Sequence, residues 1–480
     1  MDQNTSFLRF ASPGERRLIS REDLGFYSAV AVGAVYDFSA RCQTDSTSVL
    51  SAVISALKQC VRQLPHLSII VRDAASETPF YERVSDIDIK EHLSLVDAKE
   101  TGGDDRWLEE LLESTMDSPM PSSRPPWRVT ICPKAPQTYY VLFAYSHMIG
   151  DGMAGPAFHR AFLEALHVDG EIEAEKTSLL VVPSLPFPEP FDTPERLPIS
   201  WSFLLGPLIA ALLPGFVAKW LQIRAHASKV NESTWTGGDV PLEPETYRSR
   251  LKIFAVDAEH LRHSIDIARA HDAKLTAVIH QLIVRALSKC VTDDNITNFV
   301  SQTAISMRAS IGASREIWGN YASGHYGDHP RVNVHDPSPE DMWEKAASLS
   351  KEIAESTTRL HDQPIGLLRY APNIRKWLQK KLGGRRDCSY ELSNLMSFDT
   401  GKDGYHCCKI SKMIFAQPGN VVGAPISFNL ASVKGGPLVC TITWQQGALG
   451  VPVESEDALV NNIRNSLREE FASVGGKGDL

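Results

Sequence analysis

One short stretch of the chain combines a base, an acid and two glycines in a spacing that suits a reaction site. In YYVLFAYSHMIGDGMAG, an apolar run ends at His147, and Asp151 follows between Gly150 and Gly152. Imidazole takes up a proton near neutral pH, so a histidine held at the end of a strand can act as a general base. The glycines permit a tight turn that other residues would resist. Asp151 could orient the imidazole, or it could tie the turn to another part of the protein.

The elements around this motif follow from the hydrophobic pattern. PPWRVTICPK and QTYYVLFAYSH read as two strands, joined by a turn over 133–137. Apolar residues at helical spacing from Phe158 to Leu166 predict a helix directly after the glycines. The motif therefore lies at a strand-to-helix junction, where the strand fixes the backbone of His147 and a loop presents its side chain.

The rest of the chain forms two halves, each of which mixes helices with strands. Before the motif, residues from Leu50 to Val61 have helical spacing that ends at Pro65, and the short strand LSIIVRD follows. The second half also mixes helices with strands. Its predicted strands are 249–257, 298–308, 390–398 and 409–417, with two more around a Gly-Gly turn in 425–447, and its predicted helices are 258–271, 274–290, 340–360, 365–382 and 459–471.

A proline-rich stretch separates the halves. Eight prolines fall between 183 and 214, which predicts a crossover linker over 183–245. The linker would join an N-terminal domain over 1–182 to a C-terminal domain over 246–480. The order of elements favours two α/β domains with antiparallel or mixed sheets and argues against a doubly wound fold.

Within the linker, residues 197–218 carry no charge and are long enough to be considered as a membrane span, for which about 18 apolar residues are needed. Pro207 and Pro214 interrupt the stretch, and a span here would place the two halves on opposite sides of a bilayer. A span is therefore the least favoured reading. Two others stay open: packing against the domains alone, or peripheral contact with an intracellular membrane or lipid droplet.

Composition excludes several classes of function. The formal net charge is −9 and no dense stripe of lysine and arginine is present, so no nucleic-acid partner is expected. The eight cysteines form no CxxC pair and no His/Cys/Asp cluster has ligand spacing, which predicts free thiols and no metal site. The N-terminal residues lack the pattern of a signal peptide, which favours a cytoplasmic location. The common motifs of nucleotide loops, zinc proteases and serine hydrolases are also missing.

Taken in order, motifs over nearly the whole chain resemble the fungal alcohol acetyltransferase family. This family belongs to the chloramphenicol acetyltransferase-like superfamily, with the BAHD enzymes and the condensation domains, whose shared motif is HxxxDG. The resemblance rests on SHMIGDG together with ERRLISREDLGFYSAVAVGAVYDF, LPHLSIIVRD, PPWRV, LTAVIHQLIVRAL, AISMR, GNYAS, ELSNL, IFAQ and GGPLVCTITWQQG. It implies two chloramphenicol-acetyltransferase-like α/β sandwich domains with an interdomain tunnel. The DFGWG motif of plant BAHD enzymes is absent, which leaves the CoA contacts unassigned.

The resemblance also implies roles for the motif residues. His147 would be the general base at the centre of the tunnel. Asp151 would be chiefly structural, paired across the domains with Arg308 at the end of AISMR, and Gly152 would complete the turn. Without the family, Arg308 is equally well explained as an ordinary arginine at the end of a strand.

Two amide side chains match positions that line the tunnel in related enzymes. They are Asn394 in ELSNL and Gln417 in IFAQ, whose amides could hydrogen-bond an oxyanion or the donor thioester. A turn-capping asparagine and a strand-end glutamine explain them at least as well.

The function implied is that of a CoA-dependent O-acyltransferase, active as a monomer. An acyl group, expected to be acetyl, would pass from acetyl-CoA as cosubstrate to the hydroxyl of a lipophilic alcohol such as a secondary metabolite, with no bound cofactor. One alternative is a condensation-like enzyme that uses a carrier-bound acyl donor or an amine acceptor. Another is a non-catalytic protein that binds a lipophilic ligand in the tunnel.

Overall fold

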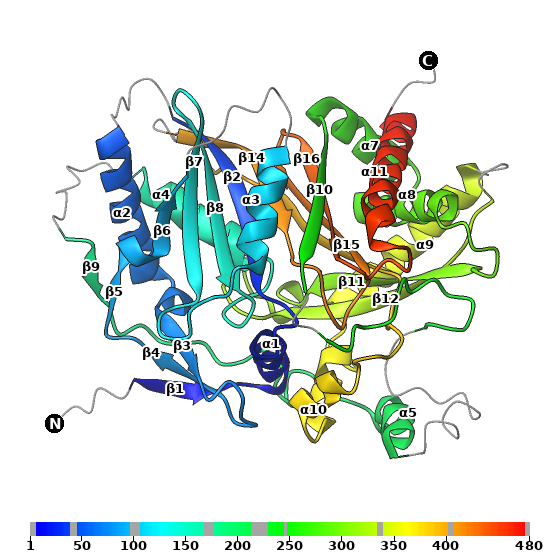
Figure 1. Ribbon diagram of the computed structural model, residues 1–480, viewed down its shortest axis with the longest axis horizontal. Helices are drawn as coiled ribbons and strands as arrows, with labels where there is room; N and C mark the ends of the chain where they lie inside the picture. Colours follow the sequence, from blue (N-terminus) through cyan, green and yellow to red (C-terminus); the bar gives the residue numbers. More distant parts are fainter. Residues whose placement is uncertain are drawn as a thin grey trace.

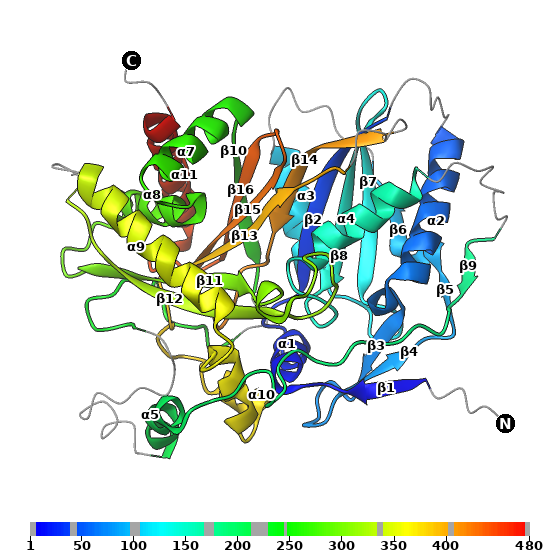
Figure 2. The same ribbon diagram turned by 180° about the vertical axis from the view of Figure 1, so that it is seen from behind.

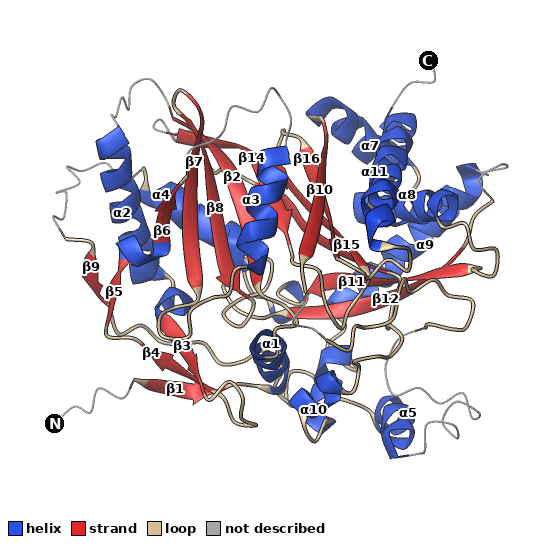
Figure 3. Ribbon diagram, in the orientation of Figure 1, coloured by secondary structure: helices blue, strands red, loops and turns tan. Residues whose placement is uncertain are grey.

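The computed structural model describes most of the chain. The described residues are 6–38, 46–96, 106–167, 177–212, 229–243, 247–333, 339–401 and 408–475. Two mixed α/β halves lie side by side, and their sheets meet near the centre of the molecule (Figure 3). This arrangement is the α/β fold that the sequence predicts.

The first sheet holds the strand that ends at the motif. Its order is β14-β2-β8-β7-β6. Helices α2 and α4 pack together over one face (Figure 2), and α3 lies on the opposite face (Figure 1). The elements are β2 (Ala29–Phe38), β6 (Leu93–Leu95), β7 (Trp127–Ala135), β8 (Thr138–Ser146), β14 (Cys408–Ala416), α2 (Ser46–Gln63), α3 (Arg106–Asp117) and α4 (Ala154–Ala165).

The second sheet is mixed, in the order β10-β16-β15-β13-β11-β12. Strand β13 runs parallel to both of its neighbours, and the other pairs are antiparallel. The elements are β10 (Ser249–Val256), β11 (Asn298–Ser306), β12 (Ala322–Pro330), β13 (Tyr390–Phe398), β15 (Ile426–Val433), β16 (Leu438–Gln445), α7 (Ala258–Ala270), α8 (Leu275–Cys290), α9 (Pro339–Thr358) and α11 (Val453–Gly475).

One strand crosses from the second half of the chain to the first. The units 1–182 and 246–480 account for most of each sheet, but β14 leaves the second half and pairs antiparallel with β2 in the first sheet. Helix α3 crosses in the other direction. Its carboxylates Glu109, Glu113 and Asp117 accept hydrogen bonds from backbone N–H groups of alternate residues of β10. Because these bonds cover the edge of β10, they also fasten the two halves together.

The remaining elements surround one end of the central region. Helix α1 (Pro13–Asp23) lies beside α10 (Ile374–Gln379) at this end, and α5 (Trp201–Leu212) lies farther out, beyond α10, in both views (Figures 1 and 2). The other pieces are β1 (Phe7–Phe10), β3 (Ile69–Arg72), β4 (Phe80–Arg83), β5 (Asp86–Asp88), β9 (Leu179–Val181) and 3₁₀ helices at Pro65–Ser68, Ile89–His92, Ala309–Ile311 and Pro364–Tyr370.

Two predicted segments differ in detail. The predicted helix over 365–382 is a 3₁₀ helix followed by the short α10, because Pro372 between them lacks an N–H and pushes Ala371 out of the helical region. In the apolar stretch, α5 has 12 residues, with Pro207 inside it, and 213–218 fall outside the described residues. Among the residues that the structure describes, no helix is both long and apolar enough to cross a membrane.

Candidate active site

His147 follows directly after β8, a central strand of the first sheet. Pairing of β8 with β2 extends to Ser146 opposite Ala29, so the backbone is fixed up to the residue before the histidine. The Ser146 hydroxyl forms a hydrogen bond with the carboxyl group of Glu22 on α1 and accepts a hydrogen bond from the N–H of Met148. The imidazole is therefore held by rigid backbone on both sides, as a positioned base requires.

The surroundings of His147 keep the ring neutral. Its Nδ1 is buried and has no hydrogen-bond partner among the described residues, and its ring meets the Tyr27 ring edge-on at 5.8 Å between centroids. Burial, with the nearby positive charge of Arg21, lowers the pKa of His147 to about 4. A neutral imidazole at pH 7 has a free lone pair, which is the state that a general base needs.

This lowered pKa gives a test by pH. A base with a pKa near 4 is unprotonated throughout pH 5 to 7, so kcat/KM for acyl transfer should change less than about twofold in that range. An unperturbed histidine, with a pKa near 6.5, would lose about 30-fold at pH 5. Burial raises the pKa of Glu22 to about 8, so the profile should be recorded below that value. A loss centred near pH 6.5, recovered on return to pH 7, would contradict the buried neutral base.

Asp151 makes its contacts away from His147. Arg308 donates through Nη1 to Oδ2 at 2.8 Å and through Nη2 to Oδ1 at 2.9 Å, and both side chains are buried. The carboxylate also accepts from the backbone N–H groups of Tyr321 and Met153. In the described part of the chain no hydrogen bond joins Asp151 to the imidazole. Of the two roles considered from the sequence, the geometry therefore favours the one in which Asp151 ties the turn to the second half.

The glycines of the motif are required for close packing. Neither Gly150 nor Gly152 has a positive φ, so their freedom to turn is not what the fold uses. A Cβ on Gly150 would lie 2.6 Å from the Ala154 side chain and 2.7 Å from Nε1 of Trp318. A Cβ on Gly152 would lie 2.9 Å from the Leu395 side chain. The expected reason for these glycines is thus wrong, since crowding by Ala154 and by side chains of the second half is what excludes a side chain.

His147, Asp151 and Gly152 line a cavity of about 560 Å³ between the two halves. Gln417 lines it too, and its amide is fixed at both ends: Oε1 accepts from the Tyr27 hydroxyl and Nε2 donates to Asn429, each at 2.8 Å. Residues from many helices, strands and loops form the cavity wall. Other residues that line it are Arg17, Leu18, Arg21, Leu204, Pro207, Gln302, Asn320, Tyr326, Leu367, Leu368, Lys376, Trp377, Lys380 and Glu391.

Asn394 does not share this cavity. Its Nδ2 donates to Thr276 at 3.1 Å, and its Oδ1 accepts from the N–H of Met396 at 2.7 Å. Met396 has φ +64°, a left-handed conformation that the asparagine stabilises. The tunnel-lining expectation for Asn394 is therefore wrong, and the residue caps a turn within β13.

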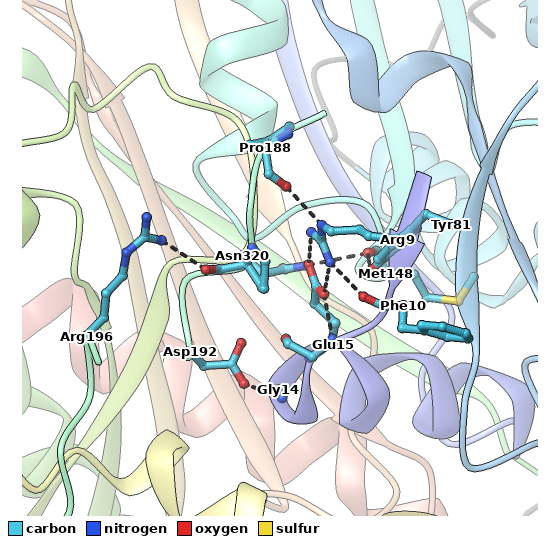
Figure 4. A network of polar contacts seen from close by, with 12 residues as sticks. Arg9, Phe10, Gly14, Glu15, Tyr81, Met148, Pro188, Asp192, Arg196 and Asn320 are labelled. Carbon is cyan, nitrogen blue, oxygen red and sulfur yellow. Dashed lines mark hydrogen bonds and ion pairs between the residues drawn. The ribbon is translucent and has the colours of Figure 1, made fainter. Parts of the chain in front are cut away.

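The backbone after His147 is held by a polar network that links α1, β1 and the linker (Figure 4). Arg9 forms a bidentate pair with Glu15 at 2.7 and 2.8 Å and also donates to the carbonyl of Pro188. The carbonyl of Met148 accepts from Tyr81 at 2.9 Å and from Asn320 at 3.4 Å. The position of the residue after the base thus depends on both halves.

Sequence reasoning missed the contribution of α1. Four residues of this region, Arg17, Arg21, Glu22 and Tyr27, meet the cavity or the backbone of the motif. Their signal was the arginine pair at i and i+4 in ERRLISRED, which places two cations on one face of a helix. Within the described ranges, no group of three His, Cys, Asp or Glu residues could hold a metal ion.

Comparison with known proteins gives one family and one fold. Residues 98–465 match the family profile described as alcohol acetyltransferase. A relative named "Probable alcohol acetyltransferase FCK4", from Fusarium pseudograminearum, is 22% identical and covers 99% of this chain and 97% of its own. The trichothecene 15-O-acetyltransferase TRI3 of Fusarium sporotrichioides superposes with a TM-score of 0.66 at 10% identity, over 98% of this chain and 99% of its own. The starter condensation domain of rhizomide synthetase RzmA, solved with C8-CoA and Leu-SNAC, gives 0.61 at 12% identity, over 98% and 95%.

Proposed function

Because the chain belongs to the alcohol acetyltransferase family, we propose that it is a CoA-dependent O-acyltransferase with His147 as its general base. The observation that carries this proposal is a buried, neutral imidazole on the wall of a cavity between the two halves. The acyl group is acetyl, and the acceptor is a lipophilic alcohol, since much of the cavity wall near α5 and α10 is apolar.

The chemistry needs only one positioned base. Nδ1 is buried, so Nε2 is the nitrogen that meets the acceptor hydroxyl. As Nε2 takes the hydroxyl proton, the oxygen attacks the thioester carbonyl and a tetrahedral oxyanion forms. Collapse of this intermediate breaks the C–S bond, and the CoA thiolate takes the proton from the imidazolium. A positioned base contributes roughly 10²–10⁴-fold, and orientation of the two substrates supplies much of the remainder.

A direct assay separates this proposal from its alternatives. Purified protein is incubated with acetyl-CoA and a panel of lipophilic alcohols, while free thiol and ester mass are followed. Thiol release that matches ester formation supports the acyltransferase. Amide formation with amine acceptors, or activity only with a carrier-bound donor, would favour the condensation-like alternative. Tight binding of lipophilic alcohols without turnover would favour a non-catalytic tunnel protein.

Helix α5 presents an apolar stripe at the edge of the cavity, and we propose that it contacts a membrane surface. Trp201, Leu205 and Ile209 are spaced four residues apart and are 73%, 45% and 39% exposed. On the same helix, Leu204 and Pro207 line the cavity. A tryptophan-bearing apolar helix face suits the interfacial region of a bilayer. A lipophilic acceptor could then pass from the lipid into the cavity along α5.

Positive charge near the same edge of the cavity favours contact with an anionic lipid surface. Lys376 and Lys380, one turn apart at α10, are exposed, also line the cavity, and belong to no ion pair among the described residues. Each basic group near an anionic membrane adds about 1 kcal/mol of attraction.

Substituting the stripe tests this contact. The triple variant Trp201→Ser, Leu205→Ser, Ile209→Ser should bind vesicles of phosphatidylcholine and phosphatidylserine several-fold more weakly in a sedimentation assay. Val181→Ser is the control, because Val181 is 77% exposed but lies on β9 in the other half. Equal sedimentation of the triple variant and the wild type would mean that α5 only packs on the domains.

A further inference from the structure

Two arginines of α1 reach the cavity that holds His147. Arg17 and Arg21 are one helical turn apart and both line this cavity. Arg21 is 6% exposed, and its guanidinium carbon lies 4.0 Å from the centroid of the Tyr27 ring. Stacking on an aromatic face holds a guanidinium in place without using its N–H donors. Arg21 is thus fixed next to the ring that contacts the imidazole, and Arg17 lies one turn away on the same cavity wall.

Among the described residues, no carboxylate contacts either cation directly. In the part of the chain that the structure describes, neither Arg17 nor Arg21 forms an ion pair, and Nε of Arg21 is buried without a hydrogen bond. Within the described ranges, Glu391, also on the cavity wall, is the one carboxyl group that interacts electrostatically with both arginines. Several other charged residues of the wall are already paired: Asp151 with Arg308, Glu15 with Arg9, and Lys381 with Asp387. Asp192 accepts a hydrogen bond from the N–H of Gly14, and Lys376 and Lys380 are exposed at α10.

The balance of charge is positive. Because burial raises the pKa of Glu22 to about 8, this carboxyl is protonated at pH 7 and does not neutralise the arginines. Burial lowers the pKa of Arg17 to about 10, which still leaves the group charged. Buried charges without partners are costly, so an arrangement of this kind is typical of a site that awaits an anion.

The distance to His147 limits what that anion can be. The Tyr27 ring lies 4.0 Å from the Arg21 guanidinium and 5.8 Å from the imidazole. Arg21 is therefore within about 10 Å of the imidazole, whereas an extended pantetheine arm, at roughly 1.2 Å a bond, keeps the CoA phosphates about 14 Å from the sulfur. The anion that fits is a group close to the reacting centre.

We propose that Arg17 and Arg21 form a carboxylate subsite for one of the two reacting molecules. This inference rests on the proposed acyltransferase function and names its substrate class. The carboxylate belongs either to the acceptor, which is then a lipophilic hydroxy acid, or to the acyl group, which is then a dicarboxylic acyl chain in place of acetyl. Guanidinium binds carboxylate with two parallel N–H···O bonds, so both affinity and orientation follow. In a hydroxy acid, about eight bonds between hydroxyl and carboxyl, at roughly 1.2 Å a bond, are enough to span this distance.

The test compares matched substrates in the full-length protein. With acetyl-CoA as donor, kcat/KM for 8-hydroxyoctanoic acid should exceed that for octan-1-ol by at least about 10-fold. The variant Arg21→Gln should lower this ratio at least 10-fold, Arg17→Gln should lower it too, and Arg21→Lys should restore part of it. The control is Arg16→Gln, on the same helix, because Arg16 donates to the carbonyl of Glu77 and does not line the cavity. Melting temperatures show whether each variant is folded.

A second arm identifies which molecule carries the carboxylate. With octan-1-ol as acceptor, succinyl-CoA is compared with butyryl-CoA. A preference for succinyl-CoA that Arg21→Gln removes assigns the carboxylate to the acyl group. The same ratio in wild type and Arg21→Gln in both arms would overturn the subsite. Weaker CoA binding by Arg21→Gln as the only effect would also overturn it, since the arginines would then serve the CoA phosphates.

Calorimetry separates this inference from the proposed function. Should no alcohol be acylated, binding of 8-hydroxyoctanoate and octan-1-ol is still measurable. Tighter binding of the hydroxy acid that depends on Arg21 would support the carboxylate subsite even as the acyltransferase proposal fails. Equal binding of the two probes by wild type and Arg21→Gln would overturn the subsite on its own.

Discussion

The variant His147→Ala should lower kcat/KM for acyl transfer by at least about 10²-fold. In the wild type the acceptor hydroxyl loses its proton to a neutral imidazole, and no second histidine lines the same cavity among the described residues. An alanine leaves the hydroxyl without a base at this position. Positioning of the two substrates by the cavity remains, so a residual rate above the uncatalysed one is expected.

Two measurements show whether this loss is chemical. The melting temperature of His147→Ala should stay close to that of the wild type, because the removed ring makes no hydrogen bond through Nδ1. CoA binding, followed by calorimetry, should be retained. The control variant His260→Ala replaces an exposed histidine of α7 and should keep full activity. A folded His147→Ala protein with near-normal turnover would remove the proposed mechanism.

The motif could be read from the sequence because its signals are local. His147 follows an unbroken strand pattern, and a helical pattern begins directly after Gly152, so the junction is fixed within about twenty residues. The pairing of Asp151 with Arg308 spans 157 positions of the chain, and its expectation came from the family resemblance alone. The structure places that contact in the expected position.

Other features depend on contacts that no local pattern encodes. Strand β14 is recognisable as a strand from its own residues, but nothing in them indicates that it leaves the second sheet and pairs with β2. Asn394 shows the same limit. The motif that contains it does not reveal whether its amide binds a substrate or caps a turn of the backbone. The role of α1 was missed because nothing within ERRLISRED indicates that residues of the second half complete a cavity around its arginines.

Neutralising either member of the Asp151–Arg308 pair should cost about 3–5 kcal/mol of unfolding free energy, because the remaining buried charge has no partner. Asp151→Asn keeps the shape of the side chain, and Arg308→Gln removes the guanidinium. Urea unfolding of both single variants and of the double variant gives the coupling between them. The exposed pair Arg72–Glu82 is the matched control, and its neutralisation should cost no more than about 1 kcal/mol.

In the double variant the loss should be smaller than the sum of the single losses, by about 0.5–3 kcal/mol, since each single change already breaks the same pair. Activity should fall in both single variants, because the pair holds the turn after His147 against the second half through Tyr321 and Gly319. Strictly additive losses of stability would mean that the two side chains do not meet. A mild Arg308→Gln beside an inactive Asp151→Asn would instead assign Asp151 to the orientation of the imidazole, which the observed hydrogen bonds argue against.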